Sequence, residues 1–324
     1  MRWTTPLAWA LALAGCGAPL DVPPEGGMDG GMDASRIDAA ACERDARCLP
    51  PLGPPPVAGC NPELGVECDG DWTGSDPRTG ELYCDPACAA AECCAPRDGR
   101  FQCVARGADG ACPAADVFVD ARVIDGLYTI EEQTFAESDC AIAEGCVGGS
   151  RGRRLLRFEV ATPNHGDADV FLGAAPELGV STPLFEWSAC HAHHHFPGYA
   201  DYELLTADGC CAVVRGRKQS FCLTDLLRDR PDMGAEEPAY DCGYQGIQRG
   251  WRDVYAAGLD CQWLDITGVP SGEYVLRVRL NTDHALLESD YQNNEALVPV
   301  TIPRDLATAG LRRRGRRCRP WSGP

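Results

Sequence analysis

The chain has 324 residues and a formal net charge of −19, from 29 Lys and Arg against 48 Asp and Glu. Nucleic-acid binding is therefore not expected, because phosphates repel so acidic a protein. The length allows about two domains, one of which could bury a full hydrophobic core.

The first 15 residues resemble an export signal. Arg2 supplies a positive charge, and residues 6–14 form an apolar stretch too short to span a bilayer. The segment ends in Leu13-Ala14-Gly15-Cys16, which resembles a bacterial lipobox. We therefore expect a signal peptide over 1–15 and an exported protein whose only membrane contact is a lipid on Cys16, in the cell envelope and in its outer membrane. An ordinary cleaved signal is the alternative.

The next two segments differ in cysteine content. Residues 16–41 have few large apolar side chains, which predicts a flexible tether. Residues 42–112 hold ten cysteines, and so short a segment has little core of its own, which predicts a cysteine-rich module held by disulfides. Zinc is the rival, but paired CxxC spacings are missing. Nineteen cysteines follow Cys16, an odd number that leaves at least one thiol outside pairs within the chain.

The segment 113–303 has the pattern of a β-rich domain. Short apolar runs alternate with Gly, Pro, Asn and Asp clusters, and long helical periodicity is missing. The runs cover residues 117–119, 155–160, 202–205, 274–280 and 296–302. We expect an all-β fold, an antiparallel β-sandwich with long loops preceded by the small disulfide-rich module. The Arg-rich residues 304–324 predict a solvated tail.

Four of the six histidines fall between His191 and His195. Neutral imidazole is a common metal ligand, and strand alternation would place His191, His193 and His195 on one face with His194 on the other. Imidazole suits zinc, copper, iron and nickel, so the cluster alone does not identify the metal. A histidine-rich surface loop without metal is the alternative.

Several motifs over residues 113–302 resemble, in order and spacing, the lysyl oxidases, a family of copper-dependent amine oxidases with a quinone made from their own side chains. The motifs are Leu155-Leu156-Arg157-Phe158 and the segments 186–195, 202–205, 218–225, 253–255, 260–267, 272–276 and 288–294. The resemblance implies that His191, His193 and His195 bind Cu(II). His194 stands where the family usually has tyrosine and is not expected to be a ligand.

The family's lysine tyrosylquinone falls on Lys218 and Tyr255. Lys218 is the only lysine beside 28 arginines, and the cross-link needs an amine that can lose its proton, whereas guanidinium stays protonated. The implied reaction converts a primary amine, such as peptidyl lysine, to an aldehyde, with O₂ consumed and H₂O₂ and NH₃ released. Asp253 is the candidate catalytic base, with a structural carboxylate as the alternative.

The resemblance also implies the disulfides Cys140–Cys190, Cys146–Cys261 and Cys222–Cys242. Cys210 and Cys211 have no counterpart in the family, and either could pair with Cys318 or with the other. A histidine often found three residues before the first copper ligand is replaced by Ser188. Any role that this histidine has in other family members, beyond direct binding of the metal, is therefore in doubt for this chain.

A calcium site of some family members matches five oxygen-bearing residues. They are Asp116, Glu288, Asp290, Asn293 and Asn294. Hard oxygen ligands at this spacing suit Ca²⁺, although an ordinary Asn- and Asp-rich turn accounts for them equally well.

Two other functions remain open. A non-catalytic exported metal-binding or interaction protein would bind copper or zinc without a quinone. A zinc hydrolase would use the three histidines as an open site, but the cluster contains no glutamate to act as a base.

Overall fold

The computed structural model describes residues 48–50, 70–75, 80–216 and 219–304. The expected signal peptide, Cys16, the tether, Lys218 and Cys318 lie outside the described residues.

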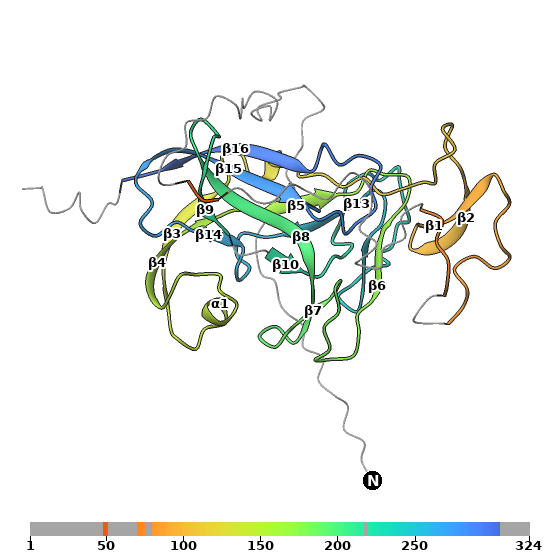
Figure 1. Cartoon of the computed structure of the whole chain (residues 1–324), viewed down its shortest axis with the longest axis horizontal. Coiled ribbons are helices and arrows are strands. Elements are labelled where there is room, and N and C mark those ends of the chain that lie inside the picture. The colour runs from red at the N-terminus through yellow and green to blue at the C-terminus, as the bar shows by residue number, and fades with distance from the viewer. Residues whose placement is uncertain (1–47, 51–69, 76–79, 217–218, 305–324) are drawn as a thin grey trace, which may run out of the picture. The chain divides into compact units, whose positions relative to one another are not determined.

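The regular secondary structure of the described chain is almost entirely antiparallel β-strand (Figure 1). The strands are β1 (Glu92–Arg97), β2 (Arg100–Ala105), β3 (Thr129–Phe135), β4 (Arg151–Arg157), β5 (Val160–Pro163), β6 (Val170–Ala174), β7 (Glu186–Ser188), β8 (His193–Thr206), β9 (Ala212–Arg215), β10 (Gln219–Phe221), β11 (Leu227–Arg228), β12 (Tyr244–Ile247), β13 (Trp251–Tyr255), β14 (Trp263–Asp265), β15 (Gly272–Leu280) and β16 (Glu295–Ile302). Helix is limited to a 3₁₀ turn at Ala121–Val123 and to α1 (Cys140–Ala143) within the described ranges. The predicted all-β fold is confirmed.

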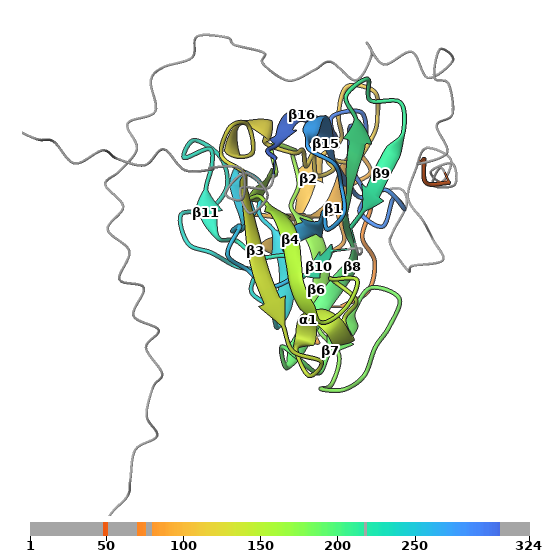
Figure 2. The ribbon, with the colours of Figure 1, turned by 90° about the vertical axis from the view of Figure 1, so that its left-hand side faces the viewer.

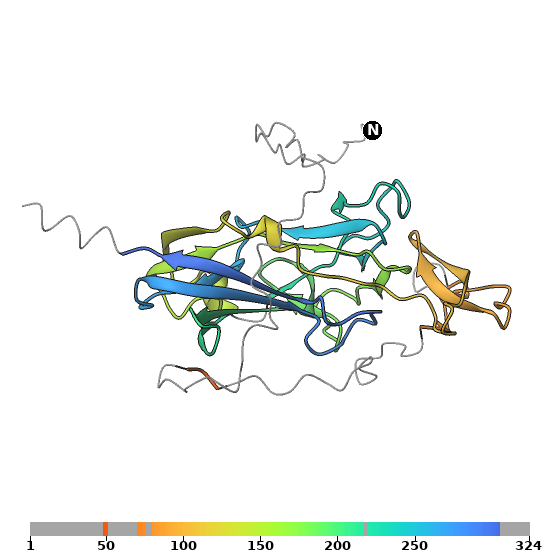
Figure 3. The same ribbon diagram turned by 90° about the horizontal axis from the view of Figure 1, so that it is seen from above.

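The largest sheet is built around β8. Its order is β10-β8-β15-β16, and β7 and β9 also pair with β8. Figure 3 shows β15 and β16 as blue arrows running side by side. Fourteen residues long, β8 extends from the histidine cluster to the centre of the sheet. One strand therefore links the candidate site to the most heavily paired part of the fold.

Three smaller sheets surround the same hydrophobic core. Their orders are β11-β13-β5, β12-β6 and β14-β4-β3. Figure 2 shows β3 and β4 side by side, and α1 lies in the connection between them. One buried cluster contains Leu204 and Leu276 of the largest sheet together with Val160 and Leu264 of the smaller ones. Shared burial of apolar surface thus holds the sheets together. Among the described residues, none of the helices is long and apolar enough to cross a membrane.

Some of the predicted strands are present in the structure and others are not. The runs 274–280 and 296–302 lie within β15 and β16, as predicted. The run 155–160 is not one strand, because β4 ends at Arg157 and β5 begins at Val160. The prediction for 117–119 is wrong, since Val117 makes only an isolated bridge. Its N–H donates to the Glu288 side chain instead of to a neighbouring strand.

The disulfides of the N-terminal segment both close it and tie it to the rest of the chain. Three of them, Cys84–Cys94, Cys88–Cys103 and Cys93–Cys112, surround the β1–β2 hairpin. A fourth joins Cys48 to Cys211. The partner of Cys211, which the sequence left open, is therefore neither Cys210 nor Cys318. The N–H of Leu49 donates to the Ala212 carbonyl at 2.8 Å, which brings Cys48 beside its partner.

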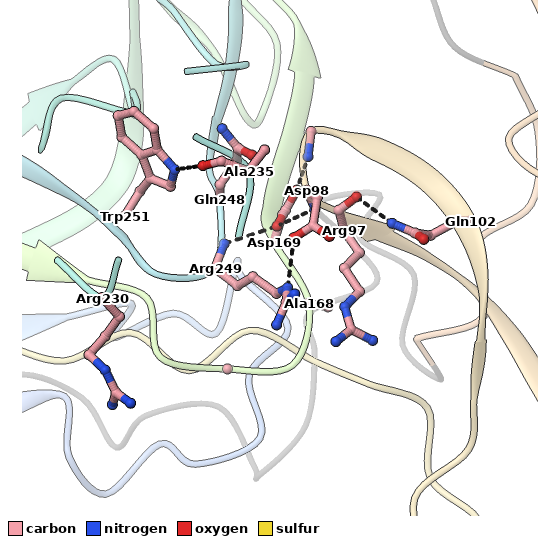
Figure 4. Close-up of polar contacts among 12 residues, drawn as sticks. Arg97, Asp98, Gln102, Ala168, Asp169, Arg230, Ala235, Gln248, Arg249 and Trp251 are labelled. Atoms are coloured by element: carbon pink, nitrogen blue, oxygen red, sulfur yellow. Dashed lines mark hydrogen bonds and ion pairs between the residues drawn. The ribbon is translucent and has the colours of Figure 1, made fainter. Parts of the chain in front are cut away.

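The turn of the β1–β2 hairpin contacts a buried carboxylate, Asp169 (Figure 4). Asp169 accepts the backbone N–H groups of Asp98 and Gly99 at 3.2 and 2.8 Å, and Arg249 Nε donates to Asp98 Oδ1 at 2.8 Å. Gly99 has a φ of +76°, and a Cβ there would lie 2.4 Å from the Ala239 Cβ. Glycine is therefore required at this turn by both conformation and space.

Candidate active site

The histidine cluster lies on the hairpin formed by β7 and β8. Ser188 is opposite His193 across the two strands, and the Ala192 N–H donates to the Ser188 carbonyl at 2.9 Å. Of the three expected ligands, His193 and His195 are on β8, where alternation places them on one face and His194 on the other. His191 belongs to the turn before β8. The prediction that strand alternation aligns all three histidines is thus wrong for His191.

The three rings gather without forming one tight set of ligand atoms. The Nε2 atoms of His193 and His195 are 3.1 Å apart. The His191 ring centroid lies 5.8 Å from that of His193 and 5.4 Å from that of His195. In the described part of the chain, the groups of side chains with ligand atoms within 4.8 Å of one another do not include all three histidines. The His191 Nε2 instead lies 3.3 Å from Oε2 of Glu144.

Burial lowers the pKa values of His193 and His195. The pKa of His195 falls to about 4, first through burial and then through the neighbouring histidines, and that of His193 is lowered for the same reasons. Both rings are therefore neutral at physiological pH. A neutral imidazole has a nitrogen lone pair available for a metal ion.

His194 points away from this group. Its Nε2 lies 2.8 Å from the Val180 carbonyl oxygen, which can only accept, so Nε2 carries the proton. Its ring packs against Trp187 with centroids 5.0 Å apart. His194 therefore fixes the loop before β7.

A cavity of about 620 Å³ opens beside the histidines. His191, His195, Trp187 and Phe221 are among the residues of its wall. The wall also contains three carboxylates, from Glu144, Glu186 and Asp260, and no Lys or Arg among the described residues. A cavity with such walls favours a positively charged ligand.

Tyr255 and Asp253 lie on β13, close to this cavity but not in its wall. Both are buried because alternate residues of β13 face the core. The Tyr255 hydroxyl lies 2.7 Å from Asp253 Oδ2 and 3.0 Å from the Cys222 carbonyl oxygen. Phe221 stacks on Tyr255 with centroids 4.5 Å apart and lies 6.0 Å from the His195 ring. Phe221 thus separates the tyrosine from the histidines.

Asp253 has an unusual environment for a carboxylate. Burial raises its pKa to about 7, although the Tyr255 hydroxyl and the Thr224 N–H, which donates at 3.1 Å, favour the ionised form. Burial, followed by the Asp253 charge, also raises the pKa of Tyr255 well above its usual value. The tyrosine is therefore a protonated phenol. The carboxyl group beside it can gain or lose a proton near neutral pH.

Three disulfides hold the loops around these residues. They are Cys140–Cys190, Cys146–Cys261 and Cys222–Cys242, the pairs that the resemblance implies. Cys190 immediately precedes His191, and Cys222 immediately follows Phe221. Such cross-links restrict loops that would otherwise be free to move.

The residues of the expected calcium site are only partly brought together. Glu288 is buried and accepts hydrogen bonds from the side-chain amides of Asn281 and Asn294 at 2.6 and 2.7 Å. Burial raises its pKa to about 8. Asp290 is exposed instead, and its side chain accepts the N–H of Gln292.

Asn293 and Asn294 add a second observation at the same place. The Asn293 amide donates to Asp116 Oδ1 at 2.7 Å. The side-chain carbonyl oxygens of Asn293 and Asn294 are buried and have no hydrogen-bond partner. Buried polar atoms are normally satisfied, so two such acceptors without a partner require an explanation.

The fold and this arrangement define a disulfide-bonded all-β protein with a candidate metal centre next to a buried tyrosine–carboxylate pair. A family model described as lysyl oxidase matches residues 108–308. The chain belongs to the lysyl oxidase family.

Individual relatives agree with this assignment. Lysyl oxidase homolog 2 of Rattus norvegicus is 36% identical over 202 residues, which cover 58% of this chain and 25% of the relative. Lysyl oxidase homolog 2A of Danio rerio is 34% identical over 212 residues, which cover 62% of this chain and 27% of the relative. The chain therefore spans about a quarter of the length of these curated relatives.

Sequence reasoning did not single out two residues of this region, Glu144 and Thr224. Thr224 lies inside one of the motifs that resemble the family, so its position was visible. Glu144 stands between Cys140 and Cys146. The implied partner of Cys140 directly precedes the histidine cluster, and the implied partner of Cys146 directly precedes Gln262. That spacing was the signal available for Glu144.

Proposed function

We propose that this protein is a copper-dependent amine oxidase that converts primary amines, peptidyl lysine among them, to aldehydes, consuming O₂ and releasing H₂O₂ and NH₃. Membership of the lysyl oxidase family supports this proposal. The observation that carries it is that the ring nitrogens of His193 and His195 converge beside the cavity. Phe221, in the wall of the same cavity, stacks on Tyr255.

The donor set fits copper. Neutral imidazoles suit Cu(II), and Nε2 atoms 3.1 Å apart can share one ion at bond lengths of about 2 Å. His193 and His195 would supply two ligands and His191 the third. When bound, copper would supply the redox chemistry that converts Tyr255 and Lys218 to lysine tyrosylquinone.

The remaining residues bind the substrate and handle its proton. The acidic wall formed by Glu144, Glu186 and Asp260 attracts an alkylammonium group. Asp253 lies against the Tyr255 hydroxyl, where a base must be placed to take a proton from a substrate held at that ring. The Thr224 N–H orients Asp253 for this role.

Ca²⁺ is proposed as a second, structural ion. Glu288, Asp116, Asn293 and Asn294 would hold it, since the two orphaned amide oxygens lack any other partner. Asp290, whose side chain serves its own loop, would have to turn inward to take part.

The protein is also proposed to be exported and anchored by a lipid on Cys16. The many disulfides indicate an oxidising compartment. Incorporation of labelled palmitate that Cys16→Ser abolishes supports the anchor, and label retained by that variant excludes it.

Peptide mass mapping after maturation with copper and oxygen tests the proposed activity. We expect one cross-linked species that joins the Lys218 and Tyr255 peptides. Separate peptides at their unmodified masses would contradict the oxidase function. Such a result with copper bound favours a non-catalytic metal-binding protein, whereas zinc-dependent hydrolysis favours the hydrolase. Lys218→Arg should keep copper and lose amine oxidation.

A further inference from the structure

Glu144 is fixed in place by its neighbours in the chain. It directly follows α1, and its N–H donates to the Cys140 carbonyl at 2.8 Å. Cys140 is bonded to Cys190, the residue before His191, and Cys146 is bonded to Cys261. Two disulfides thus tie the short segment around Glu144 to two sides of the cavity.

The Glu144 side chain connects to His191 in two ways. The Ser188 hydroxyl donates to Glu144 Oε1 at 2.8 Å and accepts the His191 backbone N–H at 3.2 Å. Oε2 of the same carboxylate lies 3.3 Å from the His191 ring nitrogen Nε2. Ser188 is only 7% exposed, so water competes little for its hydroxyl. Backbone and ring of His191 are therefore both linked to this one carboxylate.

We propose that Glu144 is a positioning residue of the metal centre, which accepts the Nε2–H of His191 and leaves Nδ1 of that ring as the nitrogen for the metal. Ligating histidines commonly donate their second ring N–H to a carboxylate, which fixes the tautomer and the ring orientation. His191 needs such a partner because it lies in a turn, whereas His193 and His195 are oriented by β8.

This role explains the departure at position 188. Ser188 stands where the family often has histidine, and here its hydroxyl holds the carboxylate that faces His191. The inference rests on the proposed copper site. It goes beyond that site by assigning to Glu144 and Ser188 the orientation of one ligand.

Copper affinity, measured by competition with a chelator, and the Cu(II) EPR spectrum test this role independently of activity. Glu144→Ala should weaken copper binding by about 10- to 100-fold, the usual loss for such a partner, and change the copper hyperfine splitting. Glu144→Gln keeps an acceptor oxygen and should lose clearly less affinity than Glu144→Ala. Ser188→Ala should weaken binding in the same direction by a smaller factor.

Asp260→Asn is the matched control, because Asp260 is an exposed carboxylate of the same cavity wall. It should keep the wild-type affinity and spectrum. Wild-type behaviour of Glu144→Ala overturns this inference alone. Equal losses in Glu144→Gln and Glu144→Ala also overturn it, because they indicate direct ligation by the carboxylate. If Glu144→Ala does not fold, unchanged copper binding in both Glu144→Gln and Ser188→Ala overturns it.

Failure of the proposed function has a different signature. In that case the wild-type protein does not bind copper, or His193→Ala binds it as well as the wild type does. Either result removes the copper site itself and this inference with it. Loss of copper in His193→Ala together with wild-type binding in Glu144→Ala leaves the proposed function intact.

Discussion

Asp253 on β13 and Glu288 in the loop between β15 and β16 are both buried carboxylates, and burial raises their pKa values to about 7 and about 8. Their surroundings differ. Asp253 lies against the hydroxyl of Tyr255 and near the histidine cavity. Glu288 accepts hydrogen bonds from the side-chain amides of Asn281 and Asn294, and the side-chain oxygen of Asn294 is buried without a partner.

The two sites differ in what an ionised carboxylate could do there. A carboxylate beside a phenol, with a pKa near neutrality, is suited to moving a proton. A carboxylate beside unpaired amide oxygens is suited to binding a hard cation, which would satisfy all of these atoms at once. The same raised pKa thus belongs to the proposed base at one place and to the proposed Ca²⁺ site at the other.

Asp253→Asn should have the largest effect. We expect amine oxidation by the copper-loaded protein to fall by about 10²- to 10⁴-fold, the usual contribution of a general base, with copper affinity unchanged. Steady-state H₂O₂ release and chelator competition measure the two quantities. Activity within a few-fold of wild type would make Asp253 a structural carboxylate and break the contrast with Glu288.

The pH dependence of the wild type examines the same residue. A base must be ionised, so kcat should rise as the pH passes through about 7. Stability should change in the opposite direction, because folding favours protonated Asp253. That contribution is complete below the unfolded pKa of about 4 and is lost as the pH rises through about 7. Denaturant titrations of wild type and Asp253→Asn should show this difference. If the difference in unfolding free energy between the two proteins does not change between pH 4 and 8, the assignment is contradicted.

Glu288→Gln should have a smaller effect that depends on calcium. Ca²⁺ at about 100 times its Kd should stabilise the wild type by about 2.7 kcal/mol, a shift of several degrees in Tm. Thermal melts with Ca²⁺ and with EDTA measure the shift. Glu288→Gln should abolish most of it and change the Tm in EDTA little. Equal Ca²⁺-dependent shifts in Tm in both proteins would show that this loop is an ordinary Asn-rich turn.

Asp98→Asn should have the smallest effect and provides a half-buried carboxylate for comparison. The substitution removes the ion pair with Arg249 but keeps the backbone N–H that Asp169 accepts. Asparagine also tolerates the φ of +57° at this position. We expect a loss of about 1 kcal/mol or less in the free energy of unfolding. A much larger loss would show that the hairpin contact stabilises the whole domain.

Much of the fold could be predicted from the sequence where one signal dominates. The alternation in 274–280 predicts β15 because one face of that strand is buried. The prediction of one strand over 155–160 is wrong because the apolar pattern continues across the break between β4 and β5. Val117 resembles a strand residue, but its N–H is taken by Glu288, far along the chain. Periodicity contains no information about such distant partners.

The sequence by itself determined the residue types: the histidine cluster, the single lysine, the motifs shared with the lysyl oxidases and a cysteine content typical of export. These signals are local, because spacing and composition can be read along the chain. The tertiary structure decided which residues meet. Glu144 reaches His191, and Asn293 and Asn294 acquire buried, unpaired oxygens, only because segments far apart in sequence pack together. Burial then raises the pKa of Asp253 and Glu288, an effect that depends on the surrounding core and not on sequence neighbours.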